Sequence, residues 1–284
     1  MIVPLDLLLP ALVMAAMTVV GLELTVDDIG RVLHYPTHVA VAVLGPVIVL
    51  PLVGASLIAL TTPGPVVTGG LILVCVAPQA TASNFLCLIG RANLALSVTV
   101  TGVSSLLALV TTPLAARLVF DVLLDRSVGF DLPYTPVMQQ ILIGMLLPVS
   151  IGMLVRHLAP GFVERQRAHL RTLTIVTLFA MLGLMVADQG DTIVRELPAI
   201  AFIAALFTTV AAATGFALAL VFSWPRDEVI TTTVGFALRS LSVATLIAIN
   251  VLGSTQFLAF AAPFFVVQAL LMVPLVLLTR RATG

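Results

Sequence analysis

The sequence predicts an all-α protein that crosses a membrane several times, and three observations support this fold class. Of the 284 residues, 60% are hydrophobic and only 9% are charged, whereas roughly a quarter of the residues in soluble domains are charged. The mean hydropathy is +1.21. The hydrophobic residues also gather in segments whose length suits a helix crossing a hydrocarbon core about 30 Å thick.

Nine hydrophobic segments follow one another along the chain, separated by turn-rich or charged connectors. In order, they cover approximately 4–22, 37–60, 64–88, 93–118, 135–157, 170–187, 198–223, 229–252 and 256–279. Several contain a proline or glycine, which a helix bundle tolerates when neighbours satisfy the freed backbone groups. The connectors are too short for a further folded unit, so we expect a single domain over 1–284.

The remaining composition excludes several classes of function. The formal net charge is zero, which gives no reason to expect nucleic-acid binding. Cys75 and Cys87 lie in apolar stretches and predict neither a disulfide framework nor a metal site. No nucleophile with a partner base lies at membrane depth, so we do not expect an enzyme. The first segment carries Asp6 and no basic residue before it, so we interpret it as a span and not as a cleaved signal peptide.

The arginines predict the orientation in the membrane. All thirteen basic residues are arginine. Nine of them fall in connectors on one side of the predicted membrane and three on the other: Arg31, Arg91, Arg156, Arg165, Arg167, Arg171, Arg226, Arg280 and Arg281 against Arg117, Arg126 and Arg195. Positive residues concentrate on the cytoplasmic side. We therefore expect a multi-pass protein of the plasma (inner) membrane with its N-terminus outside and its C-terminus cytoplasmic.

Two regions contain polar interruptions at membrane depth. In 64–92, the run Ala77–Asn84 interrupts the apolar sequence, and in 226–252 the run Thr231–Gly235 precedes a second apolar stretch. A long span lies on each side of both regions, and the two copies are five spans apart, which gives them opposite orientations. This pattern predicts an inverted-repeat secondary transporter whose two discontinuous helices cross at the midplane, where the binding site lies.

Arg239 lies just after the second interruption. It is eleven residues past Glu228, which is roughly 16 Å along a helix. Placing an arginine near the bilayer centre costs at least ~2.5 kcal/mol, and a guanidinium keeps its charge in proteins. Two interpretations remain open: Arg239 binds an anionic ligand, or it is a structural anchor on the ends of half-helices.

Several motifs resemble the bile acid:sodium symporter family in its nine-span form. They are Gly21–Thr25 followed by Asp27 and Asp28, the run from Pro78 through Thr81–Asn84, the run Arg91–Val98 and, in outline, Thr231–Gly235. The resemblance implies a core domain made of 37–118 and 198–279. It also implies a panel domain made of 4–33 and 135–190, which rocks against the core during alternating access.

The resemblance implies that the family's sodium sites are retained only in part. Ser83, Asn84, Ser97 and Thr101 match the ligands of one site, and Ser97 and Thr101 share a helical face. Thr233 stands where the family has an acidic ligand. Pro46 and Ala237 stand where the family has the glutamines of a second site, so we expect the second sodium site to be lost. Hydrogen bonding between helices is the alternative role for these polar residues.

These observations lead to a functional hypothesis. We expect a secondary active transporter of a small organic anion, with Na⁺ as the one cofactor to consider and Arg239 supplying a fixed positive charge at the crossing. The expected substrate-binding residues are Arg239, Ser240, Asn84 and Thr81, with Gln139, Gln140 and Gln268 as weaker candidates for lining a cavity. The alternatives are a sensor of the same fold without flux, or a sodium symporter that uses the first site only. The sequence leaves the substrate, the coupled ion and the oligomeric state open.

Overall fold

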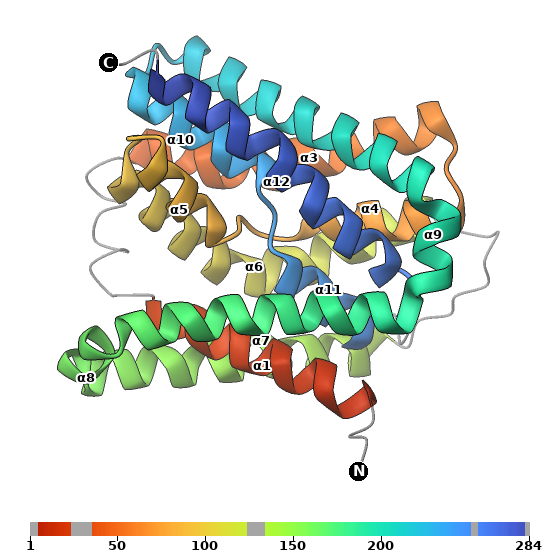
Figure 1. Ribbon diagram of the computed structural model, residues 1–284, viewed down its shortest axis with the longest axis horizontal. Helices are drawn as coiled ribbons and strands as arrows, with labels where there is room; N and C mark the ends of the chain where they lie inside the picture. Colours follow the sequence, from red (N-terminus) through yellow and green to blue (C-terminus); the bar gives the residue numbers. More distant parts are fainter. Residues whose placement is uncertain (1–4, 24–35, 124–133, 251–254, 282–284) are drawn as a thin grey trace.

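The computed structural model describes residues 5–23, 36–123, 134–250 and 255–281, and these fold almost entirely as helices (Figure 1). The helices are α1 (Leu5–Glu23), α3 (Pro36–Thr61), α4 (Pro65–Val76), α5 (Ala82–Ile89), α6 (Leu94–Leu123), α7 (Tyr134–Leu158), α8 (Pro160–Arg165), α9 (Arg167–Val221), α10 (Arg226–Ala237), α11 (Leu241–Asn250) and α12 (Leu258–Arg281). The all-α prediction is confirmed over this part of the chain.

Three of the described helices are long and apolar enough to cross a membrane by length and composition, over Pro36–Thr61, Ala168–Val221 and Leu258–Thr279. The longest, α9, joins the predicted segments 170–187 and 198–223 into one helix. A kink at Gln189 (φ −113°, ψ 16°) separates its two halves. There the Gln189 Nε2 donates to the Thr255 hydroxyl at 3.1 Å. The connector predicted between these segments is therefore helical, and the change of direction comes from one non-helical residue.

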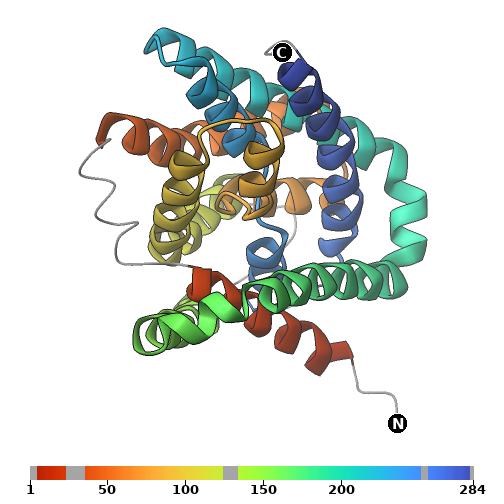
Figure 2. The same ribbon diagram turned by 60° about the vertical axis from the view of Figure 1, so that its left-hand side comes forward.

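The helices form two groups. In Figures 1 and 2, α1, α7 and the first half of α9 form one layer, and α3, α4, α5, α6, α10, α12 and the second half of α9 lie together on one side of it. The first layer falls within the predicted panel, whose residues 24–33 lie outside the described part. The second group falls within the predicted core. The division into a panel that moves against a core stays a prediction.

Glycines allow α1 and α7 to approach each other closely. A Cβ at Gly21 would lie 2.2 Å from the Val149 carbonyl oxygen, and a Cβ at Gly152 would lie 2.3 Å from that of Thr18. The two backbones are thus in direct contact, as small residues permit in membrane helices.

The first interruption separates α4 from α5, as predicted. Ala77 caps α4 with an extended backbone (φ −66°, ψ 147°). Proline sterically disfavours a helical conformation in the residue before it, and Pro78 follows. The helix α4 therefore ends here because of the local steric effect of Pro78.

The second interruption lies later than the sequence predicted. The run Thr231–Gly235 lies within α10, and the hydroxyls of Thr231, Thr232 and Thr233 donate to the carbonyls four residues before them at 2.8–2.9 Å. The helix α10 ends at Leu238 (φ −94°, ψ 111°), and α11 starts at Leu241. The break therefore consists of Leu238, Arg239 and Ser240, and Arg239 lies within it.

Candidate functional site

The two breaks meet in a short antiparallel pairing. Gln79 and Arg239 form an antiparallel β-bridge. The Ala80 amide donates to the Leu238 carbonyl at 3.0 Å, and the Ser240 amide donates to the Pro78 carbonyl at 2.9 Å. The helix ends leave these backbone groups without helical partners, and unpaired backbone groups are costly at membrane depth. The backbone groups that are freed at one break are therefore paired with those freed at the other.

The side chain of Arg239 is buried at this crossing, with 4% of its surface exposed. Its Nη2 donates to the carbonyl oxygen of Ala77, the residue that caps α4. Its backbone amide donates to Gln268 Oε1 at 3.4 Å. Among the described residues, its Nε and Nη1 have no hydrogen-bond partner. Two guanidinium nitrogens thus lack a hydrogen-bonding group among the described residues.

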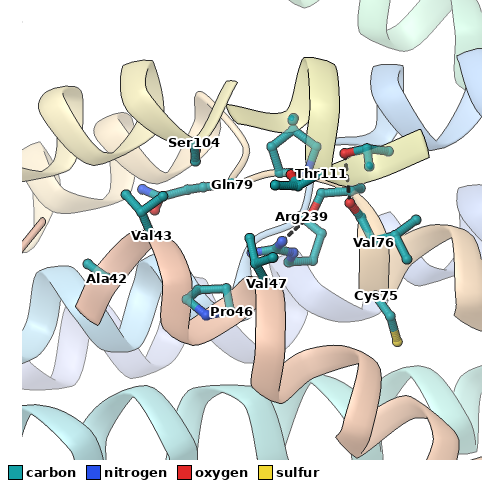
Figure 3. Close-up of a pocket in the computed structure, with 14 residues that line it drawn as sticks. Ala42, Val43, Pro46, Val47, Cys75, Val76, Gln79, Ser104, Thr111 and Arg239 are labelled. Carbon is teal, nitrogen blue, oxygen red and sulfur yellow. Dashed lines mark hydrogen bonds between the residues drawn. The ribbon is translucent and has the colours of Figure 1, made fainter. Parts of the chain in front are cut away.

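Figure 3 shows the Arg239 side chain extending toward Pro46 and Val47, into a small pocket. Three elements wall this pocket: α3 supplies Ala42, Val43, Pro46 and Val47; the end of α4 and the break after it supply Cys75–Gln79; and α6 supplies Ser104, Ala108, Thr111 and Thr112. The centre of a water molecule can occupy about 20 Å³ of it. That is room for one or two water molecules, but not for an organic anion.

Four predicted site residues lie together beside the crossing. The carbonyl oxygen of the Asn84 side chain accepts hydrogen bonds from Ser97 Oγ at 2.7 Å and from Thr101 Oγ1 at 3.1 Å. Ser83 joins them through Gln79, whose Nε2 donates to Ser83 Oγ at 2.7 Å and to Thr101 Oγ1 at 3.1 Å. We call Ser83, Asn84, Ser97 and Thr101 the hydroxyl–amide cluster. That it binds sodium stays a prediction.

Other predicted site residues make different contacts. Thr233 Oγ1 donates to the Val229 carbonyl within α10, and no contact described here joins it to the hydroxyl–amide cluster. The Thr81 carbonyl accepts from the Asn84 amide at 3.1 Å, and Ser240 Oγ accepts from the Val243 amide at 3.4 Å. Thr81 and Ser240 therefore lie directly before α5 and α11 and accept hydrogen bonds from backbone amides in the first turns of these helices. The side chains of Gln139 and Gln140 lie outside the described part.

Sequence reasoning missed the role of Gln79. It stands between Pro78 and Ala80 in a run of small residues, and its side chain is 4% exposed. A large amide side chain among small residues is the one feature that could have marked Gln79. No local pattern indicates that this side chain reaches α6. Gln268, a weak candidate from the sequence, contacts the Arg239 backbone instead of lining the pocket.

A second polar contact, also missed, joins α3 to α10. His38 Nε2 lies 3.0 Å from Glu228 Oε2, and the His38 ring stacks on Trp224 with centroids 4.4 Å apart. Asn93 Nδ2 donates to Glu228 Oε1 at 3.4 Å. Glu228 is 7% exposed. These residues connect the start of α10 to the start of α3 and to the residue before α6.

Comparisons with known proteins identify relatives of this chain. Residues 10–196 match the family model described as the Sodium Bile acid symporter family. The chain is 28% identical over 227 residues to a Bacillus subtilis protein named as an uncharacterized sodium-dependent transporter, YocS, covering 79% of this chain and 68% of that protein. It is 34% identical over 147 residues to a rice protein named as a probable chloroplastic sodium/metabolite cotransporter, BASS2, covering 51% and 33%. It is 29% identical over 217 residues to human sodium/bile acid cotransporter 4, covering 74% and 48%. The chain thus spans about two thirds of the Bacillus protein and between a third and a half of the other two.

Proposed function

The chain belongs to the sodium bile acid symporter family, and from this premise we propose that it is a secondary active transporter that moves an organic anion by alternating access. Members of this family are integral membrane transporters and not enzymes. We propose further that the protein lies in the plasma (inner) membrane with its N-terminus outside and its C-terminus in the cytoplasm. The arginine distribution supports this orientation.

The observation that carries the proposal is the buried guanidinium of Arg239. Its Nε and Nη1 have no partner among the described residues, and its charge is fixed. The N-terminal ends of α5 and α11 both begin beside the crossing, and helix N-termini carry a partial positive charge. Together these groups create a positive potential where the two breaks meet. An anionic substrate suits that potential, since a guanidinium binds carboxylate or sulfonate by charge-assisted hydrogen bonds.

Arg239 also takes the place of a cation in this proposal. In discontinuous-helix transporters, the carbonyls at the C-terminal ends of half-helices coordinate sodium. Here the carbonyl of Ala77, which caps α4, accepts a hydrogen bond from Arg239 Nη2. Pro46, where the family resemblance places a sodium-binding glutamine, lines the same pocket as Arg239. Both observations support the loss of the second sodium site.

The substrate would bind between the predicted core and panel domains. Thr81, Asn84 and Ser240 are half-buried at the crossing, whereas Arg239 is fully buried. We propose that these three residues contact the substrate directly as the panel (4–33 and 135–190) rocks against the core (37–118 and 198–279). Arg239 would reach the substrate when that motion opens the space beside it. The inverted repeat that the sequence predicts is typical of transporters that move in this way.

Uptake into proteoliposomes tests the proposal. The probes are radiolabelled taurocholate, pantothenate and pyruvate, each measured with and without a sodium gradient. We expect saturable uptake of at least one probe, and loss of that uptake in Arg239→Met. Arg195→Met is the matched control, since Arg195 is exposed in α9. Saturable binding without flux would instead favour a sensor, and coupling to two sodium ions would contradict the loss of the second site.

A symporter that uses one sodium ion is the second candidate function. The gathering of Ser83, Asn84, Ser97 and Thr101 favours it, because hydroxyl and amide oxygens are ligands that hard cations accept. Whether the cluster can accept a sodium ion depends on the hydrogen bonds that Gln79 makes to it.

A further inference from the structure

The hydroxyl–amide cluster is already filled by donors of the protein. Gln79 Nε2 lies within hydrogen-bond distance of two of its oxygens, 2.7 Å from Ser83 Oγ and 3.1 Å from Thr101 Oγ1. Ser83 and Ser97 are completely buried, and Gln79 and Thr101 are each 4% exposed. The amide nitrogen therefore lies between two buried oxygens of the cluster, one from α5 and one from α6.

Protein donors already use lone pairs of Thr101 and Asn84 that a cation would need. The Thr101 hydroxyl donates its single hydrogen toward Asn84 Oδ1 or the Ser97 carbonyl, so its oxygen is left to accept from Gln79. Asn84 Oδ1 lies within hydrogen-bond distance of two hydroxyl donors, Ser97 and Thr101, and a carbonyl oxygen has two lone pairs. A sodium ion would have to compete with protein donors for the oxygens of Asn84 and Thr101.

The charges around the cluster also disfavour a cation. Thr233 replaces the acid expected from the resemblance, and its hydroxyl is engaged within α10. Arg239, the β-bridge partner of Gln79, brings a buried positive charge to the crossing. Like charges repel more strongly where the effective dielectric constant is low. A sodium ion here would gain no anionic ligand from Thr233, and it would add a second positive charge to the crossing that already holds the buried charge of Arg239.

The oxygen end of the Gln79 side chain lies against α10, where it is buried without a hydrogen-bond partner among the described residues. A Cβ at Gly235 would lie 2.6 Å from Gln79 Oε1. The absence of a side chain at Gly235 thus leaves room for the oxygen end of the amide against α10, while the nitrogen end faces Ser83 and Thr101. The position of the amide depends on both discontinuous helices at once.

We propose that the amide of Gln79 takes the place of the sodium ion in the hydroxyl–amide cluster, so that the crossing is held together without a bound cation. Gln79 donates hydrogen bonds to oxygens of α5 and α6, and Arg239 donates one to the carbonyl at the end of α4. The inference rests on the proposed function, since it specifies how that transporter dispenses with sodium. Active transport of the anion then has to draw on a gradient other than that of sodium.

Direct sodium binding to the purified full chain tests this inference without any anion. Binding of ²²Na⁺ is measured in detergent, and thermal unfolding is compared in sodium chloride and in choline chloride at equal ionic strength. The wild type is expected to show neither saturable ²²Na⁺ binding in the millimolar range nor a sodium-specific rise in Tm. Gln79→Glu replaces the donor with a carboxylate among the same oxygens. It is expected to bind sodium saturably in the millimolar range where the wild type does not, since a carboxylate is a ligand that hard cations prefer.

Gln268→Glu is the matched control. It adds the same charge beside Arg239, whose amide Gln268 contacts, but on α12 and outside the hydroxyl–amide cluster. It is expected to gain no sodium binding. A gain equal to that of Gln79→Glu would show that any acid near Arg239 suffices, which would overturn the inference.

Two further results would also overturn it. One is saturable sodium binding by the wild type that Ser97→Ala or Thr101→Val abolishes. The other is a folded Gln79→Glu that binds no sodium. If Gln79→Glu does not fold, Gln79→Gly decides: it frees the oxygens from the amide and must bind sodium more tightly than the wild type. Absence of flux for every anion probe would contradict the proposed transport function and leave these binding results unchanged.

Discussion

Gln79 and Arg239 are partners in an antiparallel β-bridge at the point where the two discontinuous helices cross, and their side chains serve different groups. Figure 3 shows Gln79 extending toward Ser104 and Arg239 toward Pro46 and Val47. Gln79 donates to the hydroxyls of Ser83 and Thr101, and Arg239 to the carbonyl of Ala77. One pair of neighbouring residues thus supplies donors to both parts of the crossing.

Replacing Arg239 separates a functional role from an anchoring role. Buried polar groups without partners cost about 1–3 kcal/mol each, and Arg239 has two such nitrogens. Arg239→Met also leaves the Ala77 carbonyl without its donor, which offsets part of the gain. We therefore expect its thermal stability to stay within about 1 kcal/mol of the wild type or to rise, while anion uptake is lost.

Thermal unfolding in detergent and uptake in proteoliposomes measure the two effects on the same preparation. A structural anchor would produce the opposite pattern, with a clearly lowered Tm and uptake that falls only in proportion to the folded fraction. Arg195→Met controls for the removal of an exposed arginine.

Two threonines in α6 allow a matched test of the hydroxyl–amide cluster. Thr101 contacts Asn84 and Gln79, whereas the Thr99 hydroxyl donates to the Ala95 carbonyl of its own helix at 2.9 Å. Both are buried. Thr101→Val removes one acceptor of the Gln79 amide and one donor to Asn84, so we expect a loss of about 1–3 kcal/mol in stability. Thr99→Val should cost less than about 1 kcal/mol. Equal losses, measured by thermal unfolding, would mean that the cluster has no special stabilising role.

Some of this arrangement follows from local sequence, and some does not. Pro78 stops α4 by a steric effect on Ala77, so the first break was predictable. No comparable signal marks Leu238, and the threonine run misled the prediction because its hydroxyls bond within the helix. Asn84, Ser97 and Thr101 were found through the resemblance and lie together as expected. Gln79 joins them through contacts with residues up to twenty-two positions away, which a single sequence does not indicate.

Gly235 and Gly183 form a matched pair of helical glycines. A Cβ at Gly235 would press on the amide of Gln79, whereas a Cβ at Gly183 meets nothing within 4 Å. Alanine is favoured over glycine inside a helix by roughly 0.5–1 kcal/mol, so Gly183→Ala should raise stability by that amount. Gly235→Ala should lower it by about 1–3 kcal/mol, because the added carbon forces neighbouring groups to move. Thermal unfolding of both variants checks the opposite signs. A rise in both would show that the Gln79 side chain adjusts freely and is not fixed by α10.

The contact between α3 and α10 provides a spectroscopic test. Trp224 is the only tryptophan in the chain, and it stacks on His38, which lies 3.0 Å from the buried Glu228. His38→Ala removes the stacked ring and a partner of the carboxylate, so we expect a changed Trp224 emission and a stability loss of about 1–3 kcal/mol. Glu228→Gln retains an acceptor for His38 and Asn93 and should leave the stacking, and therefore the emission, nearly unchanged. If both variants shift the emission equally, the Glu228 charge and not the stacked ring sets the environment of Trp224.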